Sequence, residues 1–327
     1  MDILNIQLRP DMRRAILFGL LFIFFLSSVG CTFLSVNLVA PVEPLKEKRI
    51  AGHGKDKILL VDVSGVISGE EEGLGGEPGL VERIKEELTK ASKDDRIKAI
   101  ILRIDSPGGT VTASDIIYNE IMRYKEKNGV KVIASIMDLG ASGAYYIAQS
   151  ADSIMAHPTS VVGSIGVIMI KVDIGGLLEK IGVGAKPIKS GDKKDMGSPF
   201  RPLTPEEQEI FQSVIDDMYE RFLSVIVKGR GMELERIKKV ADGRIYTAGQ
   251  AKAIGLIDGI GYLEDTIEAT MREAGIDDAS VVVYYRPSSY KNNIYSKLSG
   301  ERADLVGIGS RELKDMIRPK FMYLWLP

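Results

Sequence analysis

The sequence KAIILRIDSPGGTVTASDIIYNEIMRYKEKNGVKVIASIMDLGASGAYYIAQSAD, residues 98–152, decides the fold. Its apolar runs at 98–105 and 130–137 are rich in β-branched residues, which is typical of buried strands. The sequence between them predicts a helix from about Ser114 to Glu126, and a helix of small residues follows the second strand. Strand, helix and strand in this order predict two parallel strands joined by a crossover helix.

The alternation continues on both sides of this stretch. The run KILLVDVSGVI, 57–67, predicts another strand, and the apolar spacing within LVERIKEELTKAS predicts a helix over 80–92. The apolar run 161–174 contains two glycines and predicts a strand broken by a turn. We therefore predict an α/β fold with a mainly parallel sheet and flanking helices.

A long helix is expected after Thr204. Thr204 can cap its start, Pro205 suits the first helical position, and Glu207 completes a capping box. Residues at helical spacing then form an apolar stripe: Ile210, Val214, Met218, Phe222 and Ile226. The stripe predicts that this helix packs on the sheet or on a neighbouring subunit.

The amino terminus holds a long uncharged stretch. Arg9, Arg13 and Arg14 precede residues 15–40, which contain no charged residue. A helix rising ~1.5 Å per residue over this stretch would reach about 39 Å, enough to cross ~30 Å of hydrocarbon. Basic residues stay on the cytoplasmic side, so the chain after Pro41 would lie outside the cytoplasm.

Two other interpretations of this stretch are open. A short apolar core followed by SSVGC is typical of a lipoprotein signal, and cleavage there would leave Cys31 lipidated. Ser28, however, stands where a leucine is usual in such signals. The stretch could also be a buried core helix.

Composition argues against several classes of site. The formal net charge of −2 gives no basic footprint for nucleic acid. The single cysteine, Cys31, leaves no partner for an intramolecular disulfide. The two histidines are His53 and His157, and no cysteine cluster complements them, so a metal site is not expected.

Two stretches suit acyl chemistry. In IDSPGGT, 104–110, a buried strand ends at a turn whose glycines let backbone N–H groups face a ligand and stabilise an oxyanion. In MDLGASGAYYIAQSAD, 137–152, a strand turns into a helix at Ser142. Small neighbours keep its hydroxyl accessible, and the Gly143 N–H lies at the helix start, where partial positive charge favours an anion. The simpler alternatives are a plain turn and a helix-capping serine.

A serine nucleophile needs a base, and the residues leave two kinds of candidate. His157 is one, although a partly buried imidazole with satisfied partners is the simpler interpretation. In SGDKKDMGSPF, 190–200, Lys193 or Lys194 could act if it were held neutral in an apolar pocket. A charged pair of this kind is more often part of a solvated loop.

The motifs DSPGG, ASGAYYIA, VGSIGV and SGDKKD occur in this order, and together they resemble the signal peptide peptidases, also called protease IV. The resemblance spans about residues 57–275, including IYTAGQAKAIGLIDGIG, and the short, single-unit bacterial form fits this length. Ala144 stands where the family more often has a second glycine. The family places its lysine four residues after the serine of the SG pair, which selects Lys194 over Lys193.

The resemblance implies a crotonase/ClpP-like fold and a Ser–Lys dyad. Ser142 would be the nucleophile and Lys194 the general base. Gly109 and Gly143 would supply the N–H groups of the oxyanion hole, and Ser164 would hydrogen-bond the lysine amine. The reaction would pass through an acyl-enzyme that water then hydrolyses.

The resemblance also implies the setting of the reaction. Expected substrates are apolar peptides, above all remnant signal peptides, which a membrane-tethered site meets at high effective concentration. Expected partners are the membrane and further copies of the chain in a homo-oligomeric ring, with no cofactor, metal or nucleic acid. The expected parts are a cytoplasmic basic terminus (1–14), a membrane anchor or lipoprotein-type signal (15–40), a linker (41–56), a peptidase domain outside the cytoplasm (57–286) and a tail (287–327).

Three hypotheses compete with this one. An acyl-CoA enzyme of crotonase type would share the glycine turn but would need catalytic carboxylates. A Ser–His–Asp protease would use His157 as its base, and a catalytically inactive membrane scaffold would only bind peptides. The uncharged stretch 15–40 and the SGDKKD segment favour the Ser–Lys protease over the acyl-CoA enzyme.

The carboxyl end, KFMYLWLP, 320–327, is too apolar for a free terminus. In one interpretation Phe321, Leu324 and Trp325 pack on the protein's own surface or on a neighbour. In the other, the tail resembles substrate and adds as an extended strand to a sheet edge beside the nucleophile.

Overall fold

The computed structural model describes residues 43–69, 78–286 and 320–326. The predicted membrane anchor or lipoprotein-type signal at 15–40, with Cys31, lies outside these residues, as does most of the tail. Within the described ranges, none of the helices combines the length and the apolar character needed to cross a membrane.

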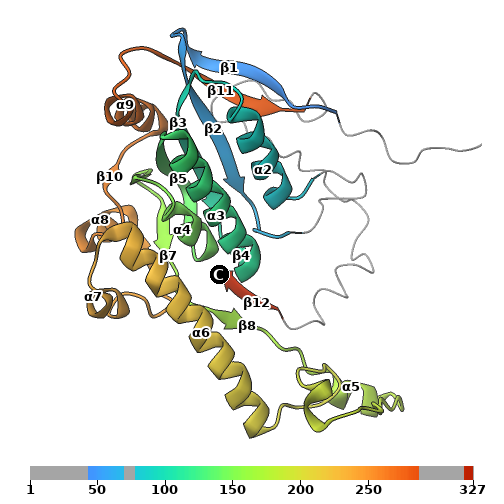
Figure 1. The fold of residues 1–327 in the computed structure, drawn as a ribbon. Coiled ribbons are helices and arrows are strands. Elements are labelled where there is room, and N and C mark those ends of the chain that lie inside the picture. Colours follow the sequence, from blue (N-terminus) through green and yellow to red (C-terminus); the bar gives the residue numbers. More distant parts are fainter. Residues whose placement is uncertain (1–42, 70–77, 287–319, 327) are drawn as a thin grey trace, which may run out of the picture. The chain divides into compact units, whose positions relative to one another are not determined.

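The described strands form one large and one small sheet, with helices around them (Figure 1). The large sheet contains β1 (Lys46–Gly52), β2 (Asp56–Ser64), β3 (Ile97–Ser106), β5 (Lys131–Ala141), β6 (Ser153–Ala156), β7 (Val161–Gly163), β9 (Ile245–Thr247), β10 (Gly259–Ile260) and β11 (Ala279–Tyr285). The small sheet contains β4 (Gly108–Thr110), β8 (Ile168–Met169) and β12 (Phe321–Leu324). The helices are α2 (Leu80–Ala91), α3 (Val111–Asn128), α4 (Gly143–Ala148), α5 (Gly175–Lys180), α6 (Pro205–Arg230), α7 (Leu234–Lys238), α8 (Ala248–Ile254) and α9 (Leu263–Ala274), with a 3₁₀ turn, η1 (Asp192–Asp195).

The strand order of the large sheet is β1-β11-β2-β3-β5-β6-β10, with β7 beside β5 and β9 beside β7. Its neighbours from β11 to β10 are parallel, and the antiparallel pairs are β1–β11 and β7–β9. The prediction of an α/β fold with a mainly parallel sheet is confirmed.

The large sheet is buried on both faces, which explains its uninterrupted apolar strands. Along β2, Leu59, Val61 and Val63 belong to one core cluster, whereas Ile58 and Leu60 belong to the other. Helices α2, α3 and α4 contribute to the first cluster and α9 contributes to the second. Side chains alternate along a strand, so a shift of one residue would move each apolar side chain to the opposite face. The division between the two clusters therefore fixes the register of the sheet.

One strand lies where the sequence predicts a linker. Within 41–56, residues Lys46–Gly52 form β1, the edge strand that pairs with β11. Its sequence, KEKRIAG, is mostly charged, as edge strands often are, because lysines there discourage pairing with other chains. A charged edge strand cannot be told from a linker by composition.

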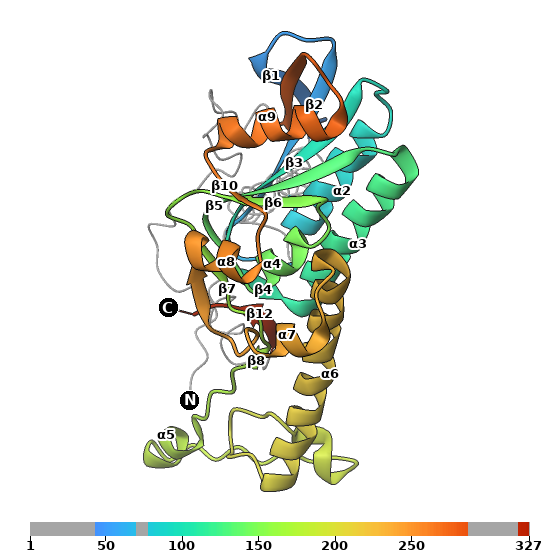
Figure 2. The same cartoon turned by 90° about the vertical axis from the view of Figure 1, so that its left-hand side faces the viewer.

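Helix α6 begins as the sequence predicts. The Thr204 side chain accepts from the Glu207 N–H, and the Glu207 carboxylate accepts from the Thr204 N–H, completing the capping box. The carboxyl-terminal half of α6 packs on the core through Phe222 and Ile226, which are fully buried. Its amino-terminal half carries the segment from β8 to Thr204, here called the arm, which extends away from the large sheet (Figures 1 and 2).

Candidate active site

The two stretches that suit acyl chemistry meet at one end of the large sheet. Strands β3 and β5 are parallel neighbours, and Ser106 lies opposite Gly140 near their carboxyl ends. The glycine turn that follows β3 and Ser142, which follows β5, are therefore brought together. This is the end of a parallel sheet at which ligands usually bind.

Ser142 is the junction between β5 and α4, as the sequence predicts. Its φ of 55° and ψ of −117° form a conformation that costs on the order of 1–3 kcal/mol in a residue with a side chain. The Ser142 N–H donates to the Gly163 carbonyl at 2.7 Å, and its carbonyl accepts from the Tyr146 N–H at 2.9 Å. A Cβ on Gly143 would lie 2.4 Å from the Ser114 hydroxyl, so the position after the serine suits only glycine.

Ser164 is the second strained serine. Ser164, with φ of 50°, and Ser142 are the two non-glycine residues with positive φ in the described ranges. Gly163, just before Ser164, lies opposite Ala141, just before Ser142, in the β5–β7 pair. The Ser164 N–H donates to the Arg244 carbonyl at 2.8 Å, which holds this turn in place. The structure thus brings both predicted serines to one spot, and strain of this kind concentrates at functional sites.

The two predicted oxyanion-hole glycines are also neighbours. The Ile67 N–H donates to the Gly108 carbonyl, and the Thr110 N–H donates to the Ile67 carbonyl, both at 2.8 Å. These bonds hold one edge of β4, so the Gly109 N–H faces the opposite edge. A Cβ on Gly143 would lie 3.2 Å from the Gly109 nitrogen. Two adjacent backbone donors of this kind suit the oxyanion formed when a carbonyl is attacked.

The chain's own tail lies beside these donors. Strand β12 lies between β4 and β8 and runs antiparallel to both, with Tyr323 opposite Gly109. A Cβ on Gly108 would lie 2.1 Å from the Tyr323 carbonyl oxygen and 2.7 Å from the Gly143 nitrogen. The Tyr323 carbonyl oxygen therefore lies near the Gly143 nitrogen, and Tyr323 is paired with Gly109. The tail does form an extended strand paired with β4 and β8, while its likeness to substrate stays a prediction.

The tail also packs on the protein's own surface, as the first interpretation predicts. The Tyr323 side chain is fully buried against Tyr146 and Phe222. The sequence gives only weak signs of these contacts, namely a tyrosine inside ASGAYYIA and a phenylalanine in an apolar stripe. Both residues also suit an ordinary core.

Lys194 and Ser142 lie in different parts of the chain. Lys194 is exposed in η1, on the arm, whereas Ser142 is 1% exposed at the start of α4. The arm lies by the amino-terminal end of α6, and α4 lies nearer the other end (Figures 1 and 2). The neighbouring Lys193 forms an ion pair with Glu206. Four of the predicted site residues lie together: Ser142, Ser164, Gly109 and Gly143. The fifth, Lys194, lies on the arm.

Ion pairs connect η1, the 3₁₀ turn that contains Lys194, to the start of α6. The Arg201 guanidinium contacts Asp195 at 2.9 Å and Glu207 at 2.6 Å, and Lys189 contacts Asp195 at 2.6 Å. Hydrogen bonds from Arg201 lower the pKa of Glu207 to about 2, and they also lower the pKa of Asp195. Both carboxylates are therefore ionised at neutral pH, and the turn keeps its place on the capped end of α6.

His157, the other candidate base, has partners of its own. Its Nδ1 lies 2.9 Å from the Thr159 hydroxyl, and its ring packs edge-on against Tyr262 with centroids 4.8 Å apart. This matches the simpler interpretation of a partly buried imidazole with satisfied partners. In the described part of the chain, no group of three or more His, Cys, Asp or Glu side chains could hold a metal ion.

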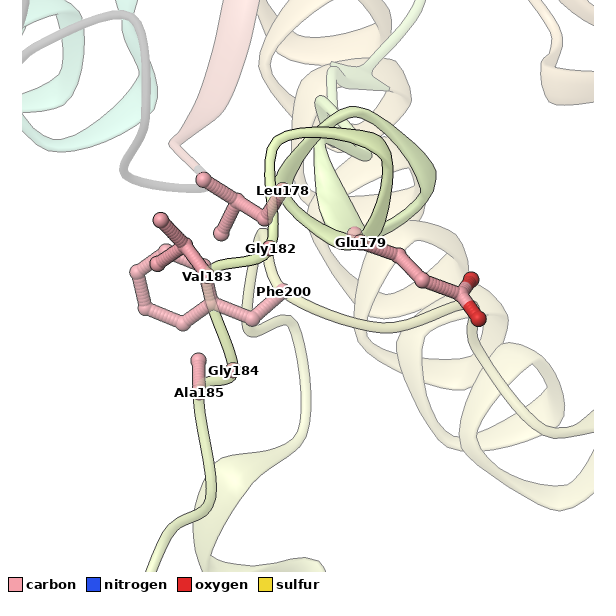
Figure 3. Close-up of a pocket in the computed structure, with 8 residues that line it drawn as sticks. Leu178, Glu179, Gly182, Val183, Gly184, Ala185 and Phe200 are labelled. Carbon is pink, nitrogen blue, oxygen red and sulfur yellow. The ribbon is translucent and has the colours of Figure 1, made fainter.

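A hollow of about 380 Å³ lies on the arm (Figure 3). Leu178, Val183 and Phe200 gather on one side of it, while the Glu179 carboxylate points away. Ile188, nearby in the sequence, is completely exposed. The arm therefore presents apolar surface that a monomer in water would ordinarily bury.

Two protein-family models match the chain. Peptidase family S49 matches residues 124–277, which include Ser142, Ser164 and Lys194. The Clp protease family matches residues 77–163, in agreement with the ClpP-like part of the expected fold.

Full sequences extend these matches. A Synechocystis protein named as a protease is 40% identical over 227 residues, which are 69% of this chain and 78% of that protein. An Enterococcus faecium protein named as signal peptide peptidase SppA is 37% identical over 235 residues, 71% of this chain and 68% of that protein. The chloroplastic serine protease SPPA of Arabidopsis thaliana is 34% identical over 271 residues, 81% of this chain but 39% of that longer protein.

Proposed function

Because the chain belongs to peptidase family S49, the family of the signal peptide peptidases, and is a serine protease, we propose that Ser142 is its nucleophile and that it cleaves apolar peptides such as remnant signal peptides. The Tyr323 carbonyl, close to the Gly143 nitrogen and opposite Gly109, carries this proposal. A peptide carbonyl held there lies within reach of Ser142, and its attack forms an oxyanion that the two N–H groups stabilise.

In this proposal Lys194 is the general base, and a neighbouring copy supplies it. The exposed apolar surface of the arm supports such a contact, because this surface gains from burial against another protomer. If the arm of each copy reaches the site of the next, the contacts are head-to-tail, and a rotation that closes on itself makes them a ring. Ser164 of the receiving copy would then hydrogen-bond the lysine amine and orient it.

The proposed substrates are extended and apolar. The extended strand β12 pairs with both β4 and β8, which supports an unfolded peptide rather than a folded domain as the substrate. We also propose that residues 15–40 anchor the protein in the cell membrane, or that a lipid on Cys31 does so, with the peptidase domain outside the cytoplasm. Digestion of intact spheroplasts should remove the domain, and the mass of the amino terminus distinguishes an intact anchor from a lipidated cysteine.

The dyad is tested by three substitutions in the detergent-solubilised full chain, assayed on a quenched apolar peptide. Ser142→Ala and Lys194→Ala should each lower activity on the order of 10³-fold or more, because residues that act as a unit fail together. Lys193→Ala is the matched control and should retain most activity, since Lys193 forms only an exposed ion pair with Glu206. A shorter soluble form should begin no later than residue 43, because β1 belongs to the sheet.

Two results would contradict these assignments. Near-normal activity of Lys194→Ala would refute the assigned base, and loss in Lys193→Ala alone would move it by one residue. A fluorophosphonate probe that labels the wild type but not Ser142→Ala would distinguish an enzyme from a scaffold that only binds peptides. Loss of activity in a folded His157→Ala variant would favour the histidine mechanism.

A further inference from the structure

Arg201 uses every N–H donor of its side chain within the arm and the start of α6. A guanidinium carries five such donors in one rigid plane. Nε and Nη2 donate to the Asp195 carboxylate at 3.0 and 2.9 Å, and Nη1 and Nη2 donate to the Glu207 carboxylate at 2.8 and 2.6 Å. The remaining donor, on Nη1, is bonded to the Pro202 carbonyl at 3.0 Å. One rigid group thus fixes the relative positions of two carboxylates.

The two carboxylates that Arg201 joins belong to η1 and to α6. Asp195 is the last residue of η1 and follows Lys194 directly, and its carboxylate also accepts from Lys189 at 2.6 Å. Glu207 is 2% exposed and completes the capping box of α6. Arg201 therefore connects the residue beside Lys194 to the capped start of a long helix, whose other end is part of the core.

The backbone of η1 by itself holds Lys194 weakly. The Lys194 N–H donates to the Gly191 carbonyl at 3.1 Å, and none of the residues of η1 is buried. A short 3₁₀ turn of this kind has poor hydrogen-bond geometry. The ion pair between Lys193 and Glu206 adds little, because its side chains are 40% and 69% exposed. The position of the turn therefore depends mainly on Asp195, whose side chain is only 11% exposed.

Building on the proposed function, we propose that Arg201 and Asp195 are positioning residues that hold Lys194 in the orientation in which one copy presents it to Ser142 of the next. A general base must lie within hydrogen-bond reach of the proton that it removes. A misplacement of about 1 Å can cost on the order of 10²-fold in rate. A base carried on an exposed arm meets this requirement only if the arm holds it rigidly.

The proposal requires an arginine at position 201. A lysine has a single ammonium with three donors on a flexible stem, so it cannot bond both carboxylates in the planar geometry of a guanidinium. Replacing Arg201 with lysine therefore keeps the positive charge of the arm and removes the rigid connection between Asp195 and Glu207. This separates the effect of position from the effect of charge.

The first test measures cleavage of a quenched apolar peptide by the detergent-solubilised full chain. Arg201→Lys should lower kcat roughly tenfold to a hundredfold with little change in KM, because a displaced base weakens the transition state and not the binding of the peptide. Asp195→Asn is the second variant. It keeps the size of the side chain but replaces one acceptor oxygen with a donor, so it should lower kcat in the same way.

The matched control is Arg230→Lys at the carboxyl end of α6. Arg230 also bonds a carboxylate through two nitrogens, with both distances to Asp258 at 2.7 Å, and it donates to the Gly255 carbonyl at 3.0 Å. Its replacement should lower the melting temperature and leave kcat per folded molecule unchanged. A merely structural role for Arg201 would give this same result in Arg201→Lys.

The second test places Arg201→Lys on one kind of chain in a mixed assembly. Chains with Ser142→Ala supply the intact Lys194, and chains with Lys194→Ala supply the intact Ser142. Arg201→Lys on the chains that supply the lysine should lower the recovered activity roughly tenfold or more. On the chains that supply the serine, the same substitution should leave the recovered activity unchanged. Equal losses from both placements would show that Arg201 supports folding or assembly, and they would overturn its assignment as a positioning residue.

The outcomes separate this inference from the proposed function. Normal kcat in folded Arg201→Lys, beside an inactive Lys194→Ala variant, overturns the role of Arg201 and leaves the dyad in place. Near-normal activity of Lys194→Ala refutes the assigned base and, with it, any residue that acts through Lys194. Absence of recovery in the mixed assemblies refutes a dyad shared between copies, and with it the presentation of Lys194 from one copy to the next.

Discussion

Ser142 and Ser164 have backbone conformations that residues with side chains rarely adopt. At a cost on the order of 1–3 kcal/mol each, such conformations persist only where the surroundings over-determine them. The Gly163 and Arg244 carbonyls accept the N–H groups of the two serines and provide that support. Two such residues at neighbouring positions support a functional role for this end of the sheet.

Glu87 is a buried carboxyl group with an unusual environment. It is 1% exposed, its Oε2 has no partner among the described residues, and Arg83 donates to its Oε1 at 3.3 Å. Burial raises the pKa of Glu87 from 4.5 to about 7, and the nearby Arg83 only partly opposes this. The folded state therefore binds this proton more tightly than the unfolded state. Stability falls as pH rises between these two pKa values and levels off above them.

We predict that Glu87→Gln removes this part of the pH dependence. At about pH 8 the variant should be more stable than the wild type, by up to roughly 3 kcal/mol, and below about pH 4.5 the two should be similar. Urea unfolding from acid to mildly alkaline pH measures the difference. Glu82→Gln, an exposed position on the same helix, should follow the wild-type curve. Identical curves for Glu87→Gln and the wild type would show that Glu87 ionises normally.

At the scale of elements, the small sheet depends on β12. This strand is the link between β4 and β8, which are not paired with each other. Its register places Phe321 opposite Met169 and Tyr323 opposite Gly109, and the Trp325 N–H donates to the Pro107 carbonyl at 2.9 Å. A peptide substrate would have to displace β12 to make the same contacts.

Deleting residues 319–327 should therefore raise the initial rate on a small apolar peptide. A tethered strand competes at an effective concentration near the millimolar range, so about a tenfold gain is expected at substrate concentrations below KM. Thermal stability should fall at the same time, because the fully buried Tyr323 side chain is lost.

The control for the tail is Leu326→Ser. Leu326 is 51% exposed, so this substitution should change neither the rate nor the melting temperature. If the truncated protein melts earlier but its rate per folded molecule is unchanged, the tail is structural and does not compete with substrate.

At the scale of the whole molecule, Ser142 and Lys194 lie in different parts of one chain. In the proposed ring, each Ser142 receives Lys194 from the neighbouring copy. We predict that co-assembling Ser142→Ala with Lys194→Ala restores activity that neither variant has alone. In a random ring, a site is complete when an intact serine meets an intact lysine from its neighbour, so about a quarter of the wild-type activity is expected.

A double variant carrying Ser142→Ala and Lys194→Ala, co-assembled with Ser142→Ala, is the control and should show no recovery. Absence of recovery in a mixed assembly verified by mass would contradict a dyad shared between copies.

The sequence by itself determined those features that depend on near neighbours along the chain. The apolar runs predicted β2, β3 and β5, and the capping box predicted the start of α6 at Thr204. It also placed Ser142 at a strand-to-helix junction. These features follow from hydrophobic periodicity and from side-chain bonds to backbone a few residues away, which a linear sequence displays directly.

Only the tertiary structure decided which distant residues meet. It joined the charged strand β1 to the sheet, placed β12 between β4 and β8, and packed Tyr323 against α4 and α6. It also separated Lys194 from Ser142, although the order of motifs suggested a single dyad. These long-range contacts depend on strand pairing and on the packing of helices over a sheet. Their energetics are set by partners far away in the sequence, so no local pattern records them.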